Sequence, residues 1–166
     1  MFWWATLVSS LGSLIQSVGA AWLMTTIAPS ADRVALVQTA GALPFFFFSL
    51  IAGAYADTHD RRFIMLASQF VMLAAAITLA SLAWFGQVTP ELLLGLTFLI
   101  GCGTAAFAPA WQASIGEQVP RDLIPSAIMA NAVGFNMARS VGPAIGGVIV
   151  AAAGAVFAFI INAVSY

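Results

Sequence analysis

The chain has 166 residues, of which 62% are hydrophobic and only 7% are charged. Soluble domains carry about 25% charged residues, so this composition excludes an ordinary soluble protein. Five basic and six acidic residues give a net charge of −1, which leaves no basic surface for a nucleic acid. The single cysteine, Cys102, lies within an apolar run and is most simply a small buried side chain.

Long apolar segments alternate with short polar links along the chain. A helix needs about 20 residues to cross a hydrocarbon core about 30 Å thick, and five segments reach that length. The sixth, 155–166, has 12 residues and spans only about 18 Å. We therefore expect an all-α membrane protein, a single transmembrane domain over 1–166 with five complete helices and a truncated sixth, cut from a longer protein. The complete crossings are expected at 2–27, 34–56, 63–85, 91–115 and 124–151.

The first segment, 2–27, carries small and polar residues at helical spacing. In lipid, such a face points to neighbouring helices or to water. Two interpretations stay open: tight packing of another helix on the small residues, or a cavity wall in which Gln16 contacts a substrate. The stripe consists of Ser9, Gly12, Ser13, Gln16, Gly19 and Ala20.

The second segment, 34–56, holds Pro44 followed by four phenylalanines, Phe45 to Phe48. Pro44 lacks a backbone donor and should kink the helix. Four consecutive rings point all round a helix, so most of them must face lipid or a neighbouring helix. The alternative is that they bind a drug-like aromatic ligand.

The link 57–62 is the densest cluster of charge in the chain, and it also contains His59. Arginines in short loops favour the cytoplasmic side of a membrane. Arg61, Arg62 and Arg121 fall on one side and Arg33 on the other, which predicts a cytoplasmic N-terminus. The aromatic residues predicted near the cytoplasmic interface are Trp3, Trp4, Tyr55 and Trp111.

The fourth segment begins with Glu91 and contains Gly101 and Gly103. A helix N-terminus favours negative charge, so we expect a structural role for Glu91. Small residues at this density allow another helix to come close.

The fifth segment, 124–151, carries three polar candidates for a cavity or a substrate contact, namely Asn131, Asn136 and Arg139. Arg139 lies about 22 Å along the helix, where a charge costs at least ~2.5 kcal/mol on insertion scales. No acidic residue is expected at that depth. Its partner is then a backbone carbonyl, a substrate or a residue outside the chain, and both substrate or ion handling and a structural tie remain open.

The link after the second segment resembles the G-x-x-x-D-x-x-G-R-[RK] signature of the major facilitator superfamily of secondary transporters. Gly53, Asp57, Arg61 and Arg62 match it, whereas Asp60 stands where the signature has glycine. The resemblance implies a conformational latch: arginines that bind carboxylates or helix-end carbonyls could hold and release the cytoplasmic ends of two helix bundles. The alternative is that the arginines only set the topology.

A second motif, formed by Gly142, Pro143, Gly146 and Gly147, is similar to the end of the antiporter motif in exporters of that superfamily. These glycines also offer a smooth face for helix packing. Two departures are visible. The upstream glycines of the motif are replaced, and residues 92–116 contain no arginine where the fourth-helix motif has one.

Other stretches, including Pro-Ala-Trp-Gln at 109–112, resemble the enterobactin-exporter and macrolide-efflux branch. The resemblance covers the whole chain and implies most of the N-terminal six-helix half of a twelve-helix fold. It implies a proton-coupled exporter of an amphipathic small molecule, such as a drug or siderophore, working by alternating access in a bacterial inner membrane. The implied partners are the substrate, a coupling proton, the lipid bilayer and the missing C-terminal half.

Two other classes of function compete with transport. An intramembrane enzyme needs a nucleophile with a base, a carboxylate pair or metal ligands at membrane depth, and the sequence offers none of these motifs. We therefore expect no enzyme, no cofactor and no metal. The remaining alternative is a non-transporting membrane remnant or scaffold from a truncated reading frame.

Overall fold

The computed structural model describes residues 2–58 and 60–166, while the side chains of Phe2, residues 49–58 and Glu117 are left undescribed. Within those two ranges the chain forms six α-helices, one short 3-10 helix and no strand. The elements are α1 (Phe2–Ile27), α2 (Ala31–Thr58), α3 (Arg61–Trp84), α4 (Pro90–Gln118), η1 (Arg121–Leu123), α5 (Ile124–Ala153) and α6 (Ala155–Ser165).

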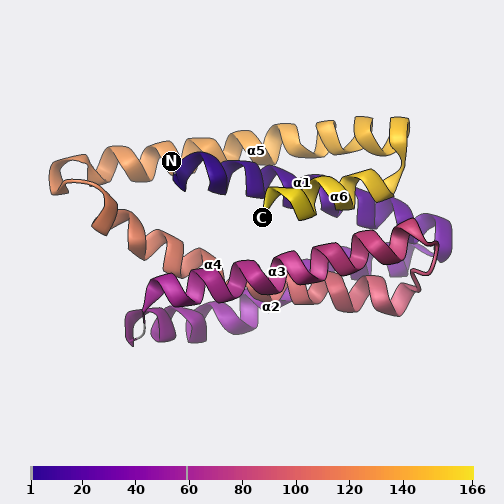
Figure 1. The fold of residues 1–166 in the computed structure, drawn as a ribbon, viewed down its shortest axis with the longest axis horizontal. Helices are drawn as coiled ribbons and strands as arrows, with labels where there is room; N and C mark the ends of the chain where they lie inside the picture. The colour runs from indigo at the N-terminus through magenta and orange to yellow at the C-terminus, as the bar shows by residue number, and fades with distance from the viewer. Residues whose placement is uncertain (1, 59) are drawn as a thin grey trace.

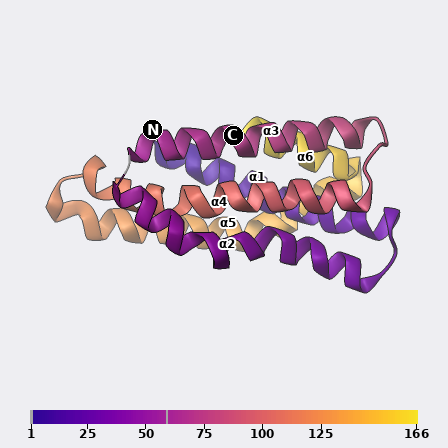
Figure 2. The same cartoon turned by 90° about the horizontal axis from the view of Figure 1, so that it is seen from below.

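The helices run lengthwise, and each connection reverses the direction of the chain (Figure 1). In Figure 1, α1, α5 and α6 form an upper layer above α2, α3 and α4. α4 runs between α2 and α3 and packs against both (Figure 2). α1 packs against α5 and α6, and contacts between α3 and α6 join the two layers.

Most helices extend beyond the apolar segments that predicted them. α2 runs over Ala31–Thr58 where 34–56 was expected, and α3 begins at Arg61 instead of residue 63. Charged residues mark where lipid ends, whereas backbone hydrogen bonding continues until a residue caps the helix. Asp60 is such a cap, because its carboxylate accepts a 2.9 Å hydrogen bond from the backbone N–H of Arg62.

Four helices in the described part of the chain are long and apolar enough to cross a membrane. They lie at Trp3–Ile27, Arg61–Trp84, Pro90–Gly116 and Arg121–Ala153. The crossing expected at 34–56 includes residues 49–56, which lie outside the described side chains. The last helix, Ala155–Ser165, is apolar but shorter.

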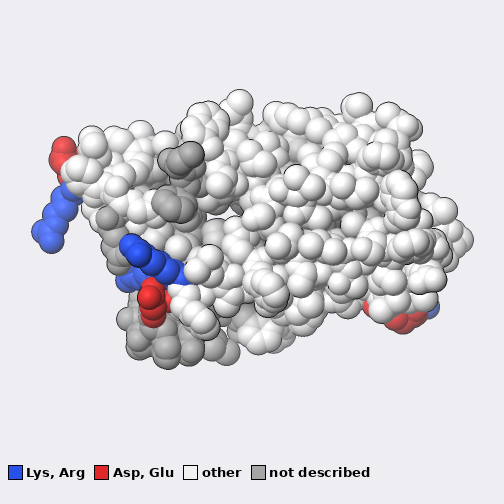
Figure 3. Space-filling view, in the orientation of Figure 1, with Lys and Arg blue, Asp and Glu red and all other residues white. Residues whose placement is uncertain are grey.

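Charged side chains lie at the two ends of the bundle on the face drawn in Figure 3, and the described surface between them is uncharged. On this face, the uncharged surface is the arrangement that a lipid bilayer requires of helices that cross it.

Close approach of α2 to α4 depends on Gly101. A Cβ atom at this position would lie 2.6 Å from the carbonyl oxygen of Gly41, which is too close for any side chain. Gly103 meets Met72 of α3 in the same way. The prediction that small residues in the fourth segment let helices approach is therefore confirmed at these two glycines.

Candidate functional site

A cavity of about 650 Å³ lies between α1, α2, α4 and α5. Its lining comes from the first three turns of α1, the C-terminal half of α4 and the N-terminal half of α5, with Phe45 from α2. The cavity therefore lies toward the end of the bundle where α3 and α5 begin. Sites for drug-sized ligands have volumes of about 300–1,000 Å³, so this cavity is of suitable size.

Aromatic side chains form much of the cavity wall. Phe107 and Trp111, one helical turn apart on α4, have nearly parallel rings with an interplanar angle of 9° and centroids 6.2 Å apart. All four consecutive phenylalanines in α2 are exposed, and among them Phe45 contributes to the cavity lining. The aromatic lining residues are Trp3, Phe45, Phe107, Trp111 and Phe135.

Trp111 is held in the wall by a hydrogen bond across helices. Its indole Nε1 donates to Oδ1 of Asn131 on α5 at 3.2 Å. This side chain is only 8% exposed, and its expected place near the membrane interface stays a prediction. Asn131 supplies inside the bundle the polar partner that an indole N–H otherwise finds at the interface.

The polar groups of the cavity are amides and hydroxyls. Nδ2 of Asn136 donates to the carbonyl oxygen of Ala132 at 2.8 Å, which leaves Oδ1 available to a ligand. None of the described lining residues is charged. The polar lining residues are Thr6, Ser10, Thr104, Gln112, Asn131 and Asn136.

Gln16, predicted as a possible substrate contact, does not belong to this lining. It is buried against α6, where its Oε1 accepts a hydrogen bond from Nδ2 of Asn162. Asn162 is fully buried. Next to Asn162, Oγ of Ser13 lies 3.0 Å from the hydroxyl oxygen of Tyr166. Sequence alone could not pair Gln16 with Asn162, because 146 residues separate them.

Arg139 has an exposed side chain and makes no hydrogen bond or ion pair with the described residues. It follows Phe135 by four positions and Asn136 by three, so it lies on the same face of α5 as these lining residues. The structure does not bring it into the cavity lining itself.

The latch residues fall partly outside the described side chains, which include neither Gly53 nor Asp57. Nη1 of Arg61 donates a 3.3 Å hydrogen bond to the carbonyl oxygen of Ala113 in α4. The side chain of Arg62 is exposed. Arg61 thus does bind a backbone carbonyl, and that carbonyl belongs to the next helix in the chain. His59 lies outside the described residues.

The predicted packing face on α5 is present at two of its three glycines. A Cβ atom at Gly142 would meet Leu14 of α1 at 2.8 Å, and one at Gly146 would meet the Cα of Ile15 at 3.1 Å. At Gly147, a Cβ atom would have no described residue's atom within 4 Å, and Pro143 is exposed. The contact face therefore follows the spacing of four residues and leaves out Gly147.

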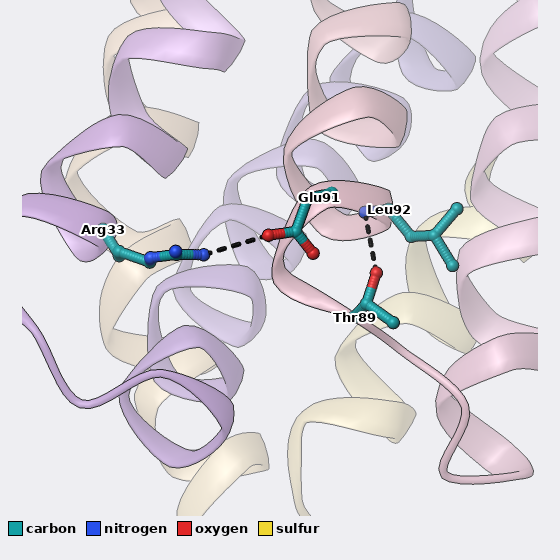
Figure 4. A network of polar contacts seen from close by, with 4 residues as sticks. All are labelled: Arg33, Thr89, Glu91 and Leu92. Carbon is teal, nitrogen blue, oxygen red and sulfur yellow. Dashed lines mark hydrogen bonds and ion pairs between the residues drawn. The ribbon is translucent and has the colours of Figure 1, made fainter.

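An ion pair joins α2 to α4 at the opposite end of the bundle. Nη1 of Arg33 lies 3.1 Å from Oε1 of Glu91, and the side chain of Thr89 caps α4 by accepting from the N–H of Leu92 (Figure 4). Glu91 lies in the first turn of α4, as predicted. Its pairing with Arg33 was not predicted, since nothing in the sequence places α2 beside α4.

A comparison of the sequence with known protein families gives a family whose members are membrane transporters, in agreement with the apolar helices and the cavity. Residues 1–166, the whole chain, match the major facilitator branch described as transmembrane secretion effector. The chain belongs to the transmembrane secretion effector family. This confirms the resemblance drawn from the loop and helix motifs, and it makes the chain an integral membrane protein of a transporter family and not an enzyme.

Three curated proteins show what this chain is similar to. The multidrug efflux pump Tap of Mycobacterium tuberculosis is 29% identical over 173 residues, covering 98% of this chain and 40% of the pump. The staphyloferrin A transporter of Staphylococcus aureus is 27% identical over 157 residues, covering 94% and 40%. Macrolide efflux protein A of Streptococcus pyogenes is 27% identical over 120 residues, covering 72% and 30%. The chain thus spans about two fifths or less of each relative.

Proposed function

We propose that the chain provides the substrate cavity of a secondary active transporter that exports an amphipathic small molecule. The observation that carries the proposal is the cavity of about 650 Å³ that combines aromatic walls with amide and hydroxyl groups. Apolar surface with a few placed polar groups is the usual composition of a small-molecule site. The efflux pumps among the relatives support the direction of transport.

In this proposal the cavity opens to one side of the membrane at a time. Residues 1–166 act as one transmembrane domain, in which α2 is a fifth complete crossing and α6 is a shorter apolar helix. The proposed latch consists of Gly53, Asp57, Arg61 and Arg62. The hydrogen bond from Arg61 to the carbonyl of Ala113 supports it, because it shows that this guanidinium reaches a helix backbone.

The proposed location is a bacterial cytoplasmic membrane with the N-terminus inside. Arg61, Arg62 and Arg121 lie at one end of the bundle, at the starts of α3 and η1. Arg33 lies at the other end and is already paired with Glu91. The pairing leaves the first end with the greater excess of arginine, which favours the cytoplasmic side.

Proton coupling is proposed from the antiporter-like motif Gly142, Pro143, Gly146 and Gly147. Gly142 and Gly146 hold α5 closely against α1, and both helices line the cavity. A shift of α5 on α1 would therefore change the cavity, which is the mechanical link that coupled export needs. Arg139, on the cavity-facing side of α5, is proposed to contact the substrate or a second polar group during that shift.

The test is flux of a fluorescent drug into inside-out vesicles that contain the complete gene product, with and without an imposed pH gradient. We expect concentrative uptake that collapses when the gradient is removed. Asp57→Asn and Arg61→Ala should abolish it while the amount of protein in the membrane stays unchanged. Gradient-independent flux would contradict proton coupling, and normal flux in both variants would contradict the latch.

A further inference from the structure

A hydrogen bond fixes the polar edge of the Trp111 indole, and the indole plane lies nearly parallel to a neighbouring phenylalanine ring. The hydrogen bond to Asn131 Oδ1 determines which way the indole N–H points. The parallel ring of Phe107 borders it on the same helix. Indole orientation therefore depends on a residue of a different helix, α5, which itself lines the cavity.

We propose that Asn131 is the positioning residue of a stacking platform made by Phe107 and Trp111, and that the platform selects an uncharged planar aromatic ligand. This inference rests on the proposed transport function and names the class of its substrate. Planar rings gain from offset stacking on an aromatic side chain, by an amount that depends on the relative orientation of the rings.

The charge of the preferred ligand follows from the lining. The described lining residues offer hydroxyls and amides but no charged group, so a ligand ion of either sign would lose water without gaining a counter-charge. An uncharged ligand loses the least hydration on entry and can still use Nδ2 of Asn131 and Oδ1 of Asn136, which have no hydrogen bond to the residues that the structure describes.

The experiment uses three probes that share one planar ring system and differ in charge: 1-pyrenemethanol, 1-pyrenemethylammonium and 1-pyrenecarboxylate. Binding to the protein in lipid nanodiscs is measured by equilibrium dialysis against empty nanodiscs. A variant whose only tryptophan is Trp111, with phenylalanine at the other four positions, reports proximity through energy transfer from the indole to pyrene. We expect the uncharged probe to bind about tenfold more tightly than either ion.

Two substitutions at one position separate positioning from charge. Asn131→Leu removes the acceptor at similar size and should weaken binding of 1-pyrenemethanol about three- to tenfold. Asn131→Asp keeps an acceptor for Trp111 Nε1 and adds a charge, so the indole stays in place and the preference moves to 1-pyrenemethylammonium. Ser140→Ala is the matched control, because its hydroxyl donates to the carbonyl oxygen of Asn136 in its own helix and Ser140 lies outside the lining.

Equal affinities for the three probes, or tighter binding of an ion by the unmodified protein, would overturn the substrate class without any variant being needed. Unchanged binding of 1-pyrenemethanol in Asn131→Leu would remove the positioning role. Export of a charged pyrene without binding of the uncharged one would contradict this inference and leave the proposed transport intact. Preferred binding of 1-pyrenemethanol without any flux would support this inference and contradict the proposed transport.

Discussion

Arg61 Nη1 donates a 3.3 Å hydrogen bond to the carbonyl oxygen of Ala113, and so ties the start of α3 to the C-terminal part of α4. Arg62, the next residue, has an exposed side chain. Two adjacent arginines of one motif therefore meet different surroundings, and only one of them bonds to the carbonyl of Ala113 in the state observed.

The difference between the two arginines predicts unequal effects on stability. Arg61→Ala should lower the free energy of unfolding by about 1.5–3 kcal/mol, the range for hydrogen bonds to charged groups. Arg62→Ala should change it by less than about 0.5 kcal/mol, as for most exposed positions. Equilibrium unfolding in mixed micelles measures both. Equal losses for the two variants would show that the bond to Ala113 contributes nothing particular.

The contact of α2 with α4 predicts that an added methyl group has opposite effects at two glycines of α4. Gly101→Ala forces a carbon against the carbonyl oxygen of Gly41 and should destabilise the protein by about 1–3 kcal/mol. Gly95→Ala meets nothing within 4 Å and should be neutral or slightly stabilising, since alanine favours a helix. Thermal unfolding of both variants in one detergent decides the matter, and a stable Gly101→Ala protein would refute the close approach.

The buried pair of Gln16 and Asn162 predicts energetic coupling between α1 and α6. Each single substitution, Gln16→Ala or Asn162→Ala, removes the hydrogen bond between the two buried amides. A double-mutant cycle should give a coupling energy of about 0.5–2 kcal/mol, within the range for polar contacts between membrane helices. Additive effects of the two substitutions would mean that the contact does not stabilise the bundle.

Sequence patterns predicted the helices well, because length and hydropathy decide which segments cross lipid. They placed the ends less well: α2 was expected at 34–56 and runs over Ala31–Thr58, since charges such as Asp57 mark the edge of the lipid and not the end of a helix. The cap at Asp60 explains the actual start of α3.

The site was only half predictable. Polar character within an apolar segment predicts Asn131 and Asn136 as cavity residues, and both line the cavity. The same reasoning predicts Gln16, yet Gln16 bonds to Asn162 on a helix that sequence spacing could not place beside α1. Trp111 and Phe107 were missed as a pair, although their separation of four residues on a helix was visible, because tryptophan more often marks a membrane interface.

The central claim is that the cavity between α1, α2, α4 and α5 is the path of the exported molecule. The most direct test is to fill the cavity with a large side chain and measure flux. Ala132 lines the cavity, so Ala132→Trp is compared with Ala130→Trp, at an exposed position of α5 outside the lining. Flux into inside-out vesicles should fall to background in Ala132→Trp and stay near the unmodified level in Ala130→Trp at equal expression. Unchanged flux with the cavity filled would contradict the account.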